Sequence, residues 1–301
     1  MSRRGWLLFS AMCVIWGIPY LLIKVAVEDL SPSMLVLART GIAALLLLPI
    51  AAARNELRQL LPYWAPVLAF AVIEIAIPWV LLGAAEQRIT SSLAGLLLAA
   101  VPLVGTVIAL ATRSSERLGL QGWVGLFLGL AGVASIVGVN LEGAGVLPLA
   151  QMALVAVCYA AGPFILQRWL ADLPPLGVIA ASLGVAAVLY VPIAAFSLPE
   201  QMPSAKAIGS VVALAVVCTA VAFLVFFALI AEVGPVRATV ITYVNPAVAA
   251  VLGVVILDEH FTLGMAVGFV LVLAGSVLAT RRGEAAVPAS APPLDPASES
   301  A

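Results

Sequence analysis

The chain alternates long apolar stretches with short polar joints. Ten apolar stretches are present, and each is close to the roughly 20 residues that a helix needs to cross the hydrocarbon core of a bilayer. Their expected bounds are 5–27, 33–53, 63–84, 90–112, 118–138, 145–167, 174–196, 205–230, 236–256 and 262–280. Turn and helix-start residues occupy the joints, for example Ser31-Pro32 and Gly234-Pro235. The pattern predicts ten transmembrane helices.

Composition supports a membrane location. Of the 301 residues, 64% are hydrophobic and 10% are charged, with a mean hydropathy of +1.19. Soluble domains carry about 25% charged residues. A lipid-embedded backbone must satisfy its own hydrogen bonds, so the spans are either helices or strands of a closed barrel. Barrel strands alternate apolar and polar residues, which these stretches do not, and we therefore expect an all-α membrane protein.

Two halves of the chain have the same layout. Pro246 follows Pro102 by 144 residues, and Glu259 follows Glu116 by 143. Further matches at these offsets are Gly125 with Gly268, Ala131 with Ala274, Gly132 with Gly275, Pro19 with Pro163, Gly41 with Gly184 and Pro49 with Pro192. We interpret residues 1–140 and 141–283 as two copies of one unit. Residues 284–301 are rich in Pro, Ala and Ser, and a disordered cytoplasmic tail is expected there.

The basic residues predict the orientation of the spans. One side of the expected topology collects Arg3, Arg4, Arg54, Arg58, Arg113, Arg117, Arg168, Arg237, Arg281 and Arg282, and the other collects Arg88 and Lys206. Cytoplasmic loops are enriched in Lys and Arg, so both termini are expected in the cytoplasm, with Arg3 and Arg4 anchoring an uncleaved first span. Five spans per copy is an odd number, so the second copy is inverted. Inverted repeats are a common plan of secondary transporters.

Three charged residues lie inside expected spans, where each is costly. Glu74 is at the middle of its span and is either a carboxylate that binds protons or a substrate amine, or a structural group bonded to a neighbour such as Arg39. Lys24 is near a span end, where it snorkels to the interface, pairs with Glu28, or binds a substrate carboxylate. For Arg39, a structural ion pair is favoured over a functional role.

Aromatic and kink-forming residues add candidates for a central cavity. The aromatic residues inside spans are Trp16, Tyr20, Trp79, Tyr159 and Tyr243. Trp16 and Tyr20 share one expected helix face, which suits either a pocket for a partly apolar solute or ordinary packing. Polar Asn245 precedes a mid-span proline. The prolines expected to kink spans, as static bends or as flexible points, are Pro19, Pro78, Pro102, Pro163 and Pro246.

Small and loop residues have simpler expected roles. Glycines on single helix faces, such as Gly132 and Gly275, predict close helix packing, either between the two halves or in a dimer. Glu116, Glu259 and His260 are expected to be solvated hairpin residues, with Glu116 and Glu259 on opposite sides of the membrane.

The repeated motif resembles a known family. Its second copy reads Asn245-Pro246, then Leu257 to Thr262, Gly268 and Ala274-Gly275, and Trp16-Gly17 with Tyr20 and Lys24 opens the chain. This pattern is similar to the EamA domain of the drug/metabolite transporter superfamily. Asp258 and Ser115 replace a usual glycine, and Gly119 a usual threonine. The resemblance covers residues 5–282 and implies a ten-span exporter of metabolites such as amino acids; nucleotide-sugar carriers share the fold.

Other functional classes have little support in the sequence. The single histidine lies in a hairpin, and no GxSG, HExxH or P-loop motif is present, so we expect neither an enzyme nor an ATP-driven pump. Three dispersed cysteines have no metal-ligand spacing, and no metal, cofactor or nucleic-acid partner is expected. The sequence predicts a monomeric exporter of amino acids or other small, aromatic or drug-like solutes in the cytoplasmic membrane, with protons as a candidate coupling ion. A solute exchanger of the same fold is the main alternative, and an intramembrane enzyme or a scaffold is less favoured.

Overall fold

The computed structural model describes residues 1–111 and 119–280, and within them every regular element is helical. The α-helices are α1 (Arg3–Ile15), α2 (Pro19–Ala26), α3 (Pro32–Ala53), α4 (Trp64–Phe70), α5 (Ile77–Glu86), α6 (Ser91–Leu98), α7 (Val101–Ala111), α8 (Leu120–Ala144), α9 (Val146–Ile165), α10 (Pro175–Ala195), α11 (Ala205–Ala215), α12 (Ala222–Val233), α13 (Pro235–Ala238), α14 (Ile241–Leu257) and α15 (Leu263–Thr280). A 3₁₀ helix (Leu57–Tyr63) and π-helical segments (Ala71–Ala76, Leu166–Leu170 and Val216–Val221) complete the set. The Glu116 hairpin and the expected tail lie outside the described residues.

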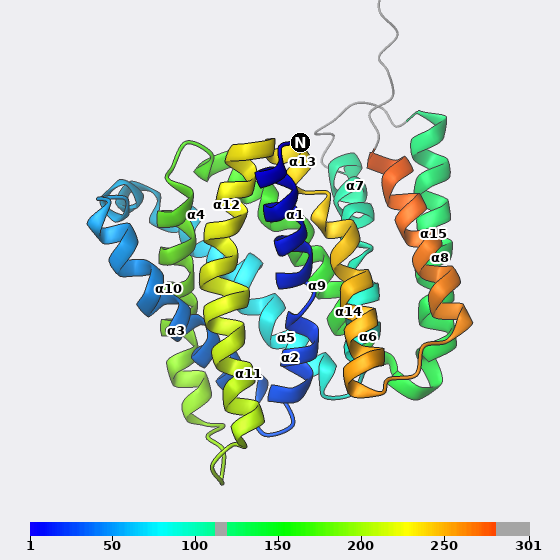
Figure 1. Ribbon diagram of the computed structural model, residues 1–301, viewed down its shortest axis with the longest axis horizontal. Helices are drawn as coiled ribbons and strands as arrows, with labels where there is room; N and C mark the ends of the chain where they lie inside the picture. Colours follow the sequence, from blue (N-terminus) through cyan, green and yellow to red (C-terminus); the bar gives the residue numbers. More distant parts are fainter. Residues whose placement is uncertain (112–118, 281–301) are drawn as a thin grey trace, which may run out of the picture.

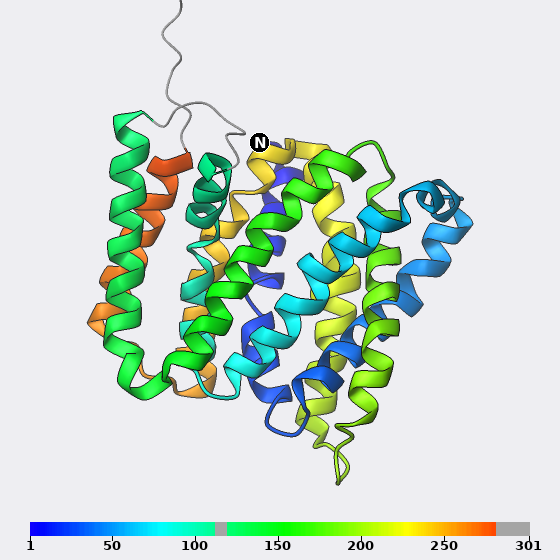
Figure 2. The ribbon, with the colours of Figure 1, turned by 180° about the vertical axis from the view of Figure 1, so that it is seen from behind.

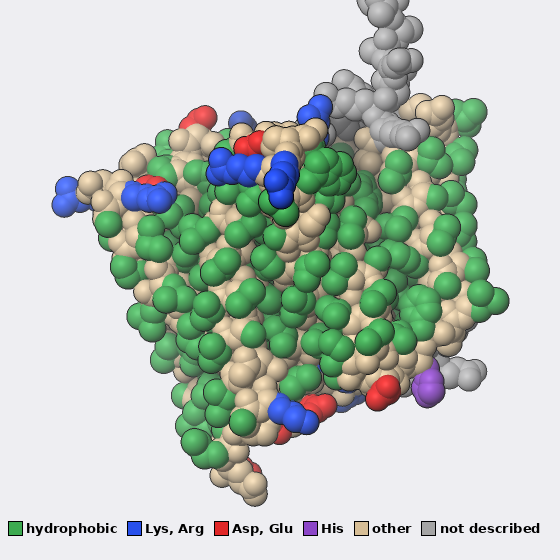
Figure 3. All heavy atoms as spheres, viewed as in Figure 1, with side chains coloured by type: hydrophobic (Ala, Val, Ile, Leu, Met, Phe, Trp, Pro, Cys, Tyr) green, Lys and Arg blue, Asp and Glu red, His purple; other side chains and the backbone are tan. Residues whose placement is uncertain are grey.

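The described residues contain nine helical stretches long and apolar enough to span a membrane, and α14 is a shorter tenth apolar helix. All ten expected segments are therefore helical, which confirms the all-α membrane class. The sides of the molecule are almost entirely apolar (Figure 3). Leu45, Val188 and Val255 are exposed there by 75%, 70% and 71%, as expected of side chains that face lipid.

Several spans are not continuous α-helices. The first breaks between Ile15 and Pro19, and the fourth breaks before Val101, ahead of Pro102. Proline has no N–H to donate and clashes with the preceding turn, so a helix tends to restart at such a residue. Pro78 follows the π-helical segment Ala71–Ala76, and Pro163 lies just before the π-helical segment Leu166–Leu170. Pro246 lies inside the continuous helix α14.

The two halves pack in a pattern that matches the repeat. The second span of each half, α3 and α10, pack together, and so do the fifth spans, α8 and α15, and the fourth spans, represented by α6 and α14. The first span of each half packs instead on the third span of the other, as α1 does on α12 and α9 on α5. Corresponding helices such as α3 and α10 run in opposite directions (Figures 1 and 2). The halves are thus two inverted copies around a shared middle.

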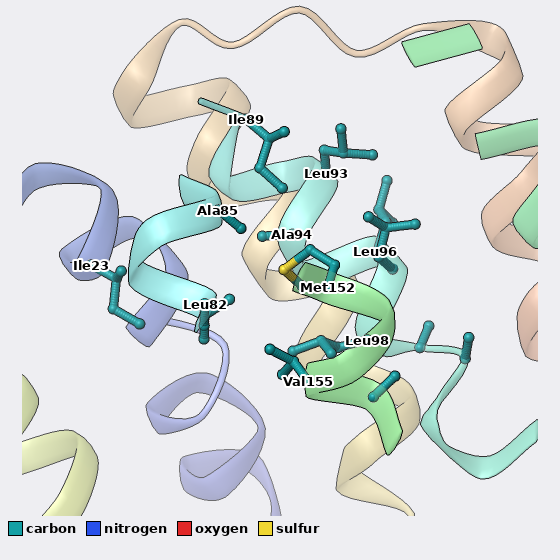
Figure 4. Packing of buried hydrophobic residues seen from close by; sticks show 14 of the residues in the cluster. Ile23, Leu82, Ala85, Ile89, Leu93, Ala94, Leu96, Leu98, Met152 and Val155 are labelled. Atoms are coloured by element: carbon teal, nitrogen blue, oxygen red, sulfur yellow. The ribbon is translucent and has the colours of Figure 1, made fainter. Parts of the chain in front are cut away.

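The hydrophobic interior joins helices of both halves. Figure 4 shows Ile23 of α2, Leu82 of α5, Leu96 of α6 and Met152 of α9 in one cluster of buried side chains, and each is at most 3% exposed. In lipid the solvent is as apolar as these side chains, so close packing rather than water exclusion holds such helices together. Tight contact is therefore the main requirement of this core.

A glycine seam lets α8 and α15 approach backbone to backbone. A Cβ on Gly132 would lie 2.6 Å from the carbonyl oxygen of Gly268, and one on Gly125 would lie 2.8 Å from that of Gly275. Both distances are shorter than real Cβ contacts allow. The small residues therefore serve packing between the two halves. Of the two expected uses, packing between the halves and packing in a dimer, the structure shows the first. This helix pair stands at one edge of the molecule (Figure 1).

Replacing Gly275 with leucine should destabilise the protein, because its Cβ would overlap the backbone of Gly129. Overpacking a tight contact costs about 1–3 kcal/mol or more. Gly138→Leu is the matched control, since Gly138 is also helical but has no atom within 4 Å of the place where a Cβ would lie. The thermal unfolding temperature of the detergent-solubilised protein should fall clearly for Gly275→Leu and little for Gly138→Leu. Equal melting temperatures of both variants would contradict the seam.

Candidate functional site

Arg39 of α3 is a buried cation near the middle of the molecule, 8% exposed. Its guanidinium carbon lies 3.7 Å from the centre of the Trp79 ring, and its Nε donates to the hydroxyl of Thr219 at 2.9 Å. Among the described residues, ion pairs join Arg4 to Glu232 and Arg54 to Glu56, and none involves Arg39. The expected structural ion pair is therefore wrong: aromatic stacking and a neutral hydroxyl hold this charge in place.

Thr219 is positioned by a π-helical segment of the second half. Its hydroxyl accepts from Arg39 and donates to the carbonyl oxygen of Leu214 at 2.8 Å. Segment Val216–Val221 has its counterpart in Ala71–Ala76 of the first half, which carries Glu74. π-Helical turns widen a helix locally and are frequent at functional sites. The fold thus places a polar side chain on the same irregular turn in both halves.

Glu74 is half-buried, and one of its two carboxylate oxygens lacks a polar partner among the described residues. Its Oε2 atom is buried and makes no hydrogen bond within the described residues. A Cβ on Gly162 of α9 would overlap this carboxylate, so the glycine makes room for it. Glu74 is not paired with Arg39, which was one of the expected arrangements. A carboxyl group in such a place is ready to exchange a proton or to meet a cationic ligand.

Two tyrosines pack against the buried interior. Tyr159 packs against both large buried clusters, one of which contains Trp79 and the other of which is also contacted by Tyr20. The ring of Tyr20 lies 3.7 Å from the position of a Cβ on Gly95 of α6. We call the following residues the central cluster: Tyr20, Arg39, Glu74, Trp79, Tyr159 and Thr219.

Lys24 binds backbone carbonyl oxygens in this structure rather than Glu28. Its ammonium donates to the backbone carbonyl oxygens of Glu86 at 2.6 Å and Ile89 at 2.9 Å, so it caps the end of α5. Within the part of the chain described, the ion pairs do not include Lys24 with Glu28. The side chain of Glu86 is 0% exposed, and both of its carboxylate oxygens are buried without a partner in the described structure.

Three expected site residues lie outside the cluster. Trp16 packs against Phe223 and Phe226, with ring centres 5.9 and 4.7 Å away. The break between α1 and α2 separates it from Tyr20, so the two do not share a continuous helix face. Tyr243 and Thr280 share a hydrogen bond of 3.2 Å.

Asn245, the third of these residues, connects α14 to α1. With its amide nitrogen turned toward α1, it donates to the carbonyl oxygens of Ile241 at 3.0 Å and Cys13 at 3.2 Å. It is 8% exposed. The amide compensates backbone carbonyls next to Pro246, which supplies no N–H of its own. Its role in this structure is helix packing.

An apolar cavity of about 280 Å³ lies beside the cluster rather than in it. Its walls come from α6 to α9 and include Leu103, Leu126, Val133 and Met152. No member of the central cluster lines it. We place the candidate site at the cluster, because the buried charged and polar side chains are there, and ligand sites combine apolar walls with a few such groups.

Sequence reasoning missed Arg39, Thr219 and Glu86 as site residues. Arg39 was visible as an intramembrane charge, but its aromatic partner is 40 residues away in sequence. The repeat offsets of 143 and 144 put Val217 and Cys218 at the position of Glu74, so the sequence repeat did not point to Thr219; the correspondence appears only in the π-helical turns. Glu86 falls between two expected spans, although it is the last residue of α5.

Replacing Thr219 with valine should destabilise the protein by about 1.5–3 kcal/mol, the usual value of a hydrogen bond to a charged group. Valine keeps the shape but leaves the Nε of Arg39 without its acceptor. Thr40→Val is the matched control: Thr40 is also 0% exposed, and its hydroxyl donates only to backbone carbonyls of Val36 and Leu37. Thermal unfolding of both variants should rank Thr219→Val well below Thr40→Val; the reverse order would refute the role of Thr219.

The fold and the cluster together define a class of protein. Two inverted bundles of apolar helices, with buried charges and aromatic rings where they meet, are the architecture of a secondary transporter. The described residues hold no cluster of side chains that could bind a metal ion. The molecule is a multi-pass membrane transporter.

Comparison with known proteins identifies the family. Residues 3–138 and 147–281 each match the EamA-like transporter family, so the chain belongs to it. It is 30% identical over 258 residues to the uncharacterized inner membrane transporter YedA of Escherichia coli K12, covering 81% of this chain and 79% of that protein. It is 24% identical to the uncharacterized transporter YvbV of Bacillus subtilis, covering 94% of both. A crystal structure at 22% identity shares the fold, with a TM-score of 0.66 over 93% of this chain and 98% of that one.

Proposed function

We propose that this transporter exports small zwitterionic metabolites, amino acids among them, by alternating access. The observation that carries the proposal is the buried guanidinium of Arg39, which has no carboxylate partner among the described residues. A solute carboxylate would supply the missing negative charge. The two inverted halves supply the two states that alternating access requires.

Arg39 is well suited to bind a carboxylate. A guanidinium carries five N–H donors, and Thr219 occupies one of them. Bidentate pairing with a carboxylate is among the strongest polar contacts in proteins. Burying a charge without such a pair costs several kcal/mol, so a structural purpose alone would favour a neutral residue here. Trp79 fixes the plane of the guanidinium and so presents its free edge in a defined direction.

Glu74 and the tyrosines complete a zwitterion site. Glu74 supplies the negative group for a solute ammonium, and protonation of the same carboxyl would release it. Tyr20, Tyr159 and Trp79 add aromatic surface for a flat or partly apolar side chain. A proton that competes with the solute ammonium at Glu74 would also give coupling to the proton gradient.

The charged residues support an orientation with the N-terminus in the cytoplasm. Figure 3 shows Lys and Arg side chains gathered at the end of the molecule that carries the N-terminus. Such an excess is typical of the cytoplasmic side. We further propose a monomer, because the glycine faces of α8 and α15, the surfaces best suited to dimerisation, are already packed on each other.

Flux into or out of proteoliposomes is the direct test. The purified protein should transport radiolabelled amino acids and discriminate against the corresponding amino-acid amides, which lack the carboxylate. The panel should include nucleotide sugars and dicarboxylates. Flux of nucleotide sugars or dicarboxylates without amino-acid flux would replace this proposal with an anion exchanger of the same fold.

Arg39→Gln should raise KM for carboxylate solutes at least tenfold, because the loss of a charged hydrogen-bonded contact is worth about 1.5–3 kcal/mol. Transport of any solute that lacks a carboxylate should change much less. Arg88→Gln, an exposed arginine beyond the end of α5, is the matched control. An unchanged KM for Arg39→Gln in protein of normal melting temperature would remove Arg39 from the site.

Glu74→Gln should abolish the pH dependence of flux. Glutamine keeps the size of the side chain but can neither bind nor release a proton in the working range. Flux should be measured between about pH 5 and 8 at a fixed membrane potential, with Glu28→Gln, an exposed loop carboxylate, as the control. A pH profile that is the same for Glu74→Gln and the unmodified protein would exclude coupling through Glu74.

A further inference from the structure

Glu259 links the two halves at the end of the molecule opposite the N-terminus. Its carboxylate accepts hydrogen bonds from the backbone N–H of Ser91 at 2.7 Å, the backbone N–H of Ser92 at 2.9 Å and the hydroxyl of Ser92 at 2.6 Å. The serines begin α6 of the first half, and Glu259 lies in the loop between α14 and α15 of the second. The expected role of Glu259 as a solvated turn residue is therefore wrong.

A glycine is required at the centre of this contact. A Cβ on Gly253 of α14 would overlap both the carboxylate of Glu259 and the hydroxyl of Ser92, and it would lie 2.8 Å from the hydroxyl of Ser91. The hydroxyl of Ser92 also lies 3.3 Å from the carbonyl oxygen of Ala250. Polar groups from the two halves therefore meet above one glycine. We call Ser91, Ser92, Gly253 and Glu259 the serine latch.

The chemistry of the latch makes it strong for its size. The first N–H groups of a helix have no partner within the helix, and the positive end of the helix dipole attracts an anion. Hydrogen bonds to a carboxylate are roughly twice as strong as those between neutral groups. Ser91 and Ser92 are both 0% exposed, so water does not compete for these bonds.

Further hydrogen bonds lie at the same end of the molecule. Lys24 binds the carbonyl oxygen of Ile89, two residues before the latch begins. The backbone N–H of Ser204 donates to Asp29 at 2.8 Å, and hydrogen bonds from Ser204 hold the pKa of that carboxyl below its ordinary value. This second contact also joins the first half to the second.

The repeat does not place the same latch residues at the other end. An offset of 143 puts Gly234 and Pro235 at the positions of Ser91 and Ser92, and Leu110 at the position of Gly253. Gly234 and Pro235 carry no hydroxyl, and a proline has no N–H. The counterpart of Glu259 is Glu116, which lies outside the described residues. The sequence therefore contains the full set of latch groups once.

We propose that the serine latch seals the Glu259 side of the transport path and makes the state closed on that side the resting state. Opening this side requires α6 to separate from α14, which breaks all three hydrogen bonds of Glu259. Because Gly234 and Pro235 replace the two serines in the second copy, the same three hydrogen bonds cannot form in the inverted state, so the two states differ in free energy even without solute. The inference rests on alternating access and is independent of the identity of the solute.

Thiol labelling from the Glu259 side tests the proposal. In protein lacking Cys13, Cys158 and Cys218, a cysteine replaces Ala250, which is 6% exposed at the seam of α6 and α14. A membrane-impermeant methanethiosulfonate reagent should label it slowly. Glu259→Gln should raise the rate at least tenfold. Asp258→Asn is the matched control: Asp258 is the exposed neighbour with φ 53°, a conformation that asparagine tolerates.

Two further variants separate opening from unfolding. Protein that keeps only Cys13, which is 5% exposed in α1, reports general loosening, and Glu259→Gln should leave its labelling slow. Ser92→Ala removes one of the three bonds and should give a smaller acceleration at position 250. Equal labelling at position 250 for Glu259→Gln and Asp258→Asn would overturn the latch. If Glu259→Gln also speeds the labelling of Cys13, the test passes to Ser92→Ala. Unchanged labelling at position 250 in Ser92→Ala would then overturn the latch. No step uses a solute, so this result is independent of the flux assay.

Discussion

The structure depends on one constraint: inside a bilayer every backbone polar group needs a partner from the protein. Three places in the structure show how side chains meet this need. Lys24 covers the carbonyl oxygens at the end of α5, Glu259 covers the N–H groups at the start of α6, and Asn245 covers carbonyl oxygens of α1 and α14. These side chains are therefore part of the helical framework, and irregular backbone lies where the two halves meet.

The same constraint explains why charge is concentrated at that junction. Lipid-facing positions carry apolar side chains, so a buried charge is tolerated only where another helix offers a ring, a hydroxyl or a carbonyl oxygen. Arg39 stacks on Trp79 of the first half and donates a hydrogen bond to Thr219 of the second half. Glu74 finds space beside Gly162, and its Oε2 has no hydrogen-bond partner among the described residues. The junction holds groups that a solute or a proton would satisfy, and a rearrangement of the halves would alter all of them together.

Sequence symmetry and chemical symmetry differ in this protein. The packing of α3 on α10, of α8 on α15 and of α6 on α14 follows the repeat closely. The polar groups do not: Ser182 matches Arg39 and Pro235 matches Ser92 at the repeat offset, and Thr219 lies on the π-helical turn that corresponds to the one carrying Glu74. We propose that apolar packing preserves the shape that both transport states share, while the unequal polar residues give the two states different energies.

The sequence by itself determined the class, the ten apolar segments, their helical nature and the two-copy plan, because length, hydropathy and spacing follow directly from the bilayer and the repeat. It also identified Tyr20, Glu74, Trp79 and Tyr159, which the fold brings into the central cluster with Arg39 and Thr219. Only the tertiary structure decided the partners. Arg39 and Thr219 are 180 residues apart, and Ser91 and Glu259 are 168 apart. No local sequence pattern encodes such pairs. They form only when the inverted helices pack together, because each buried polar group then bonds to the donor or acceptor that lies nearest to it.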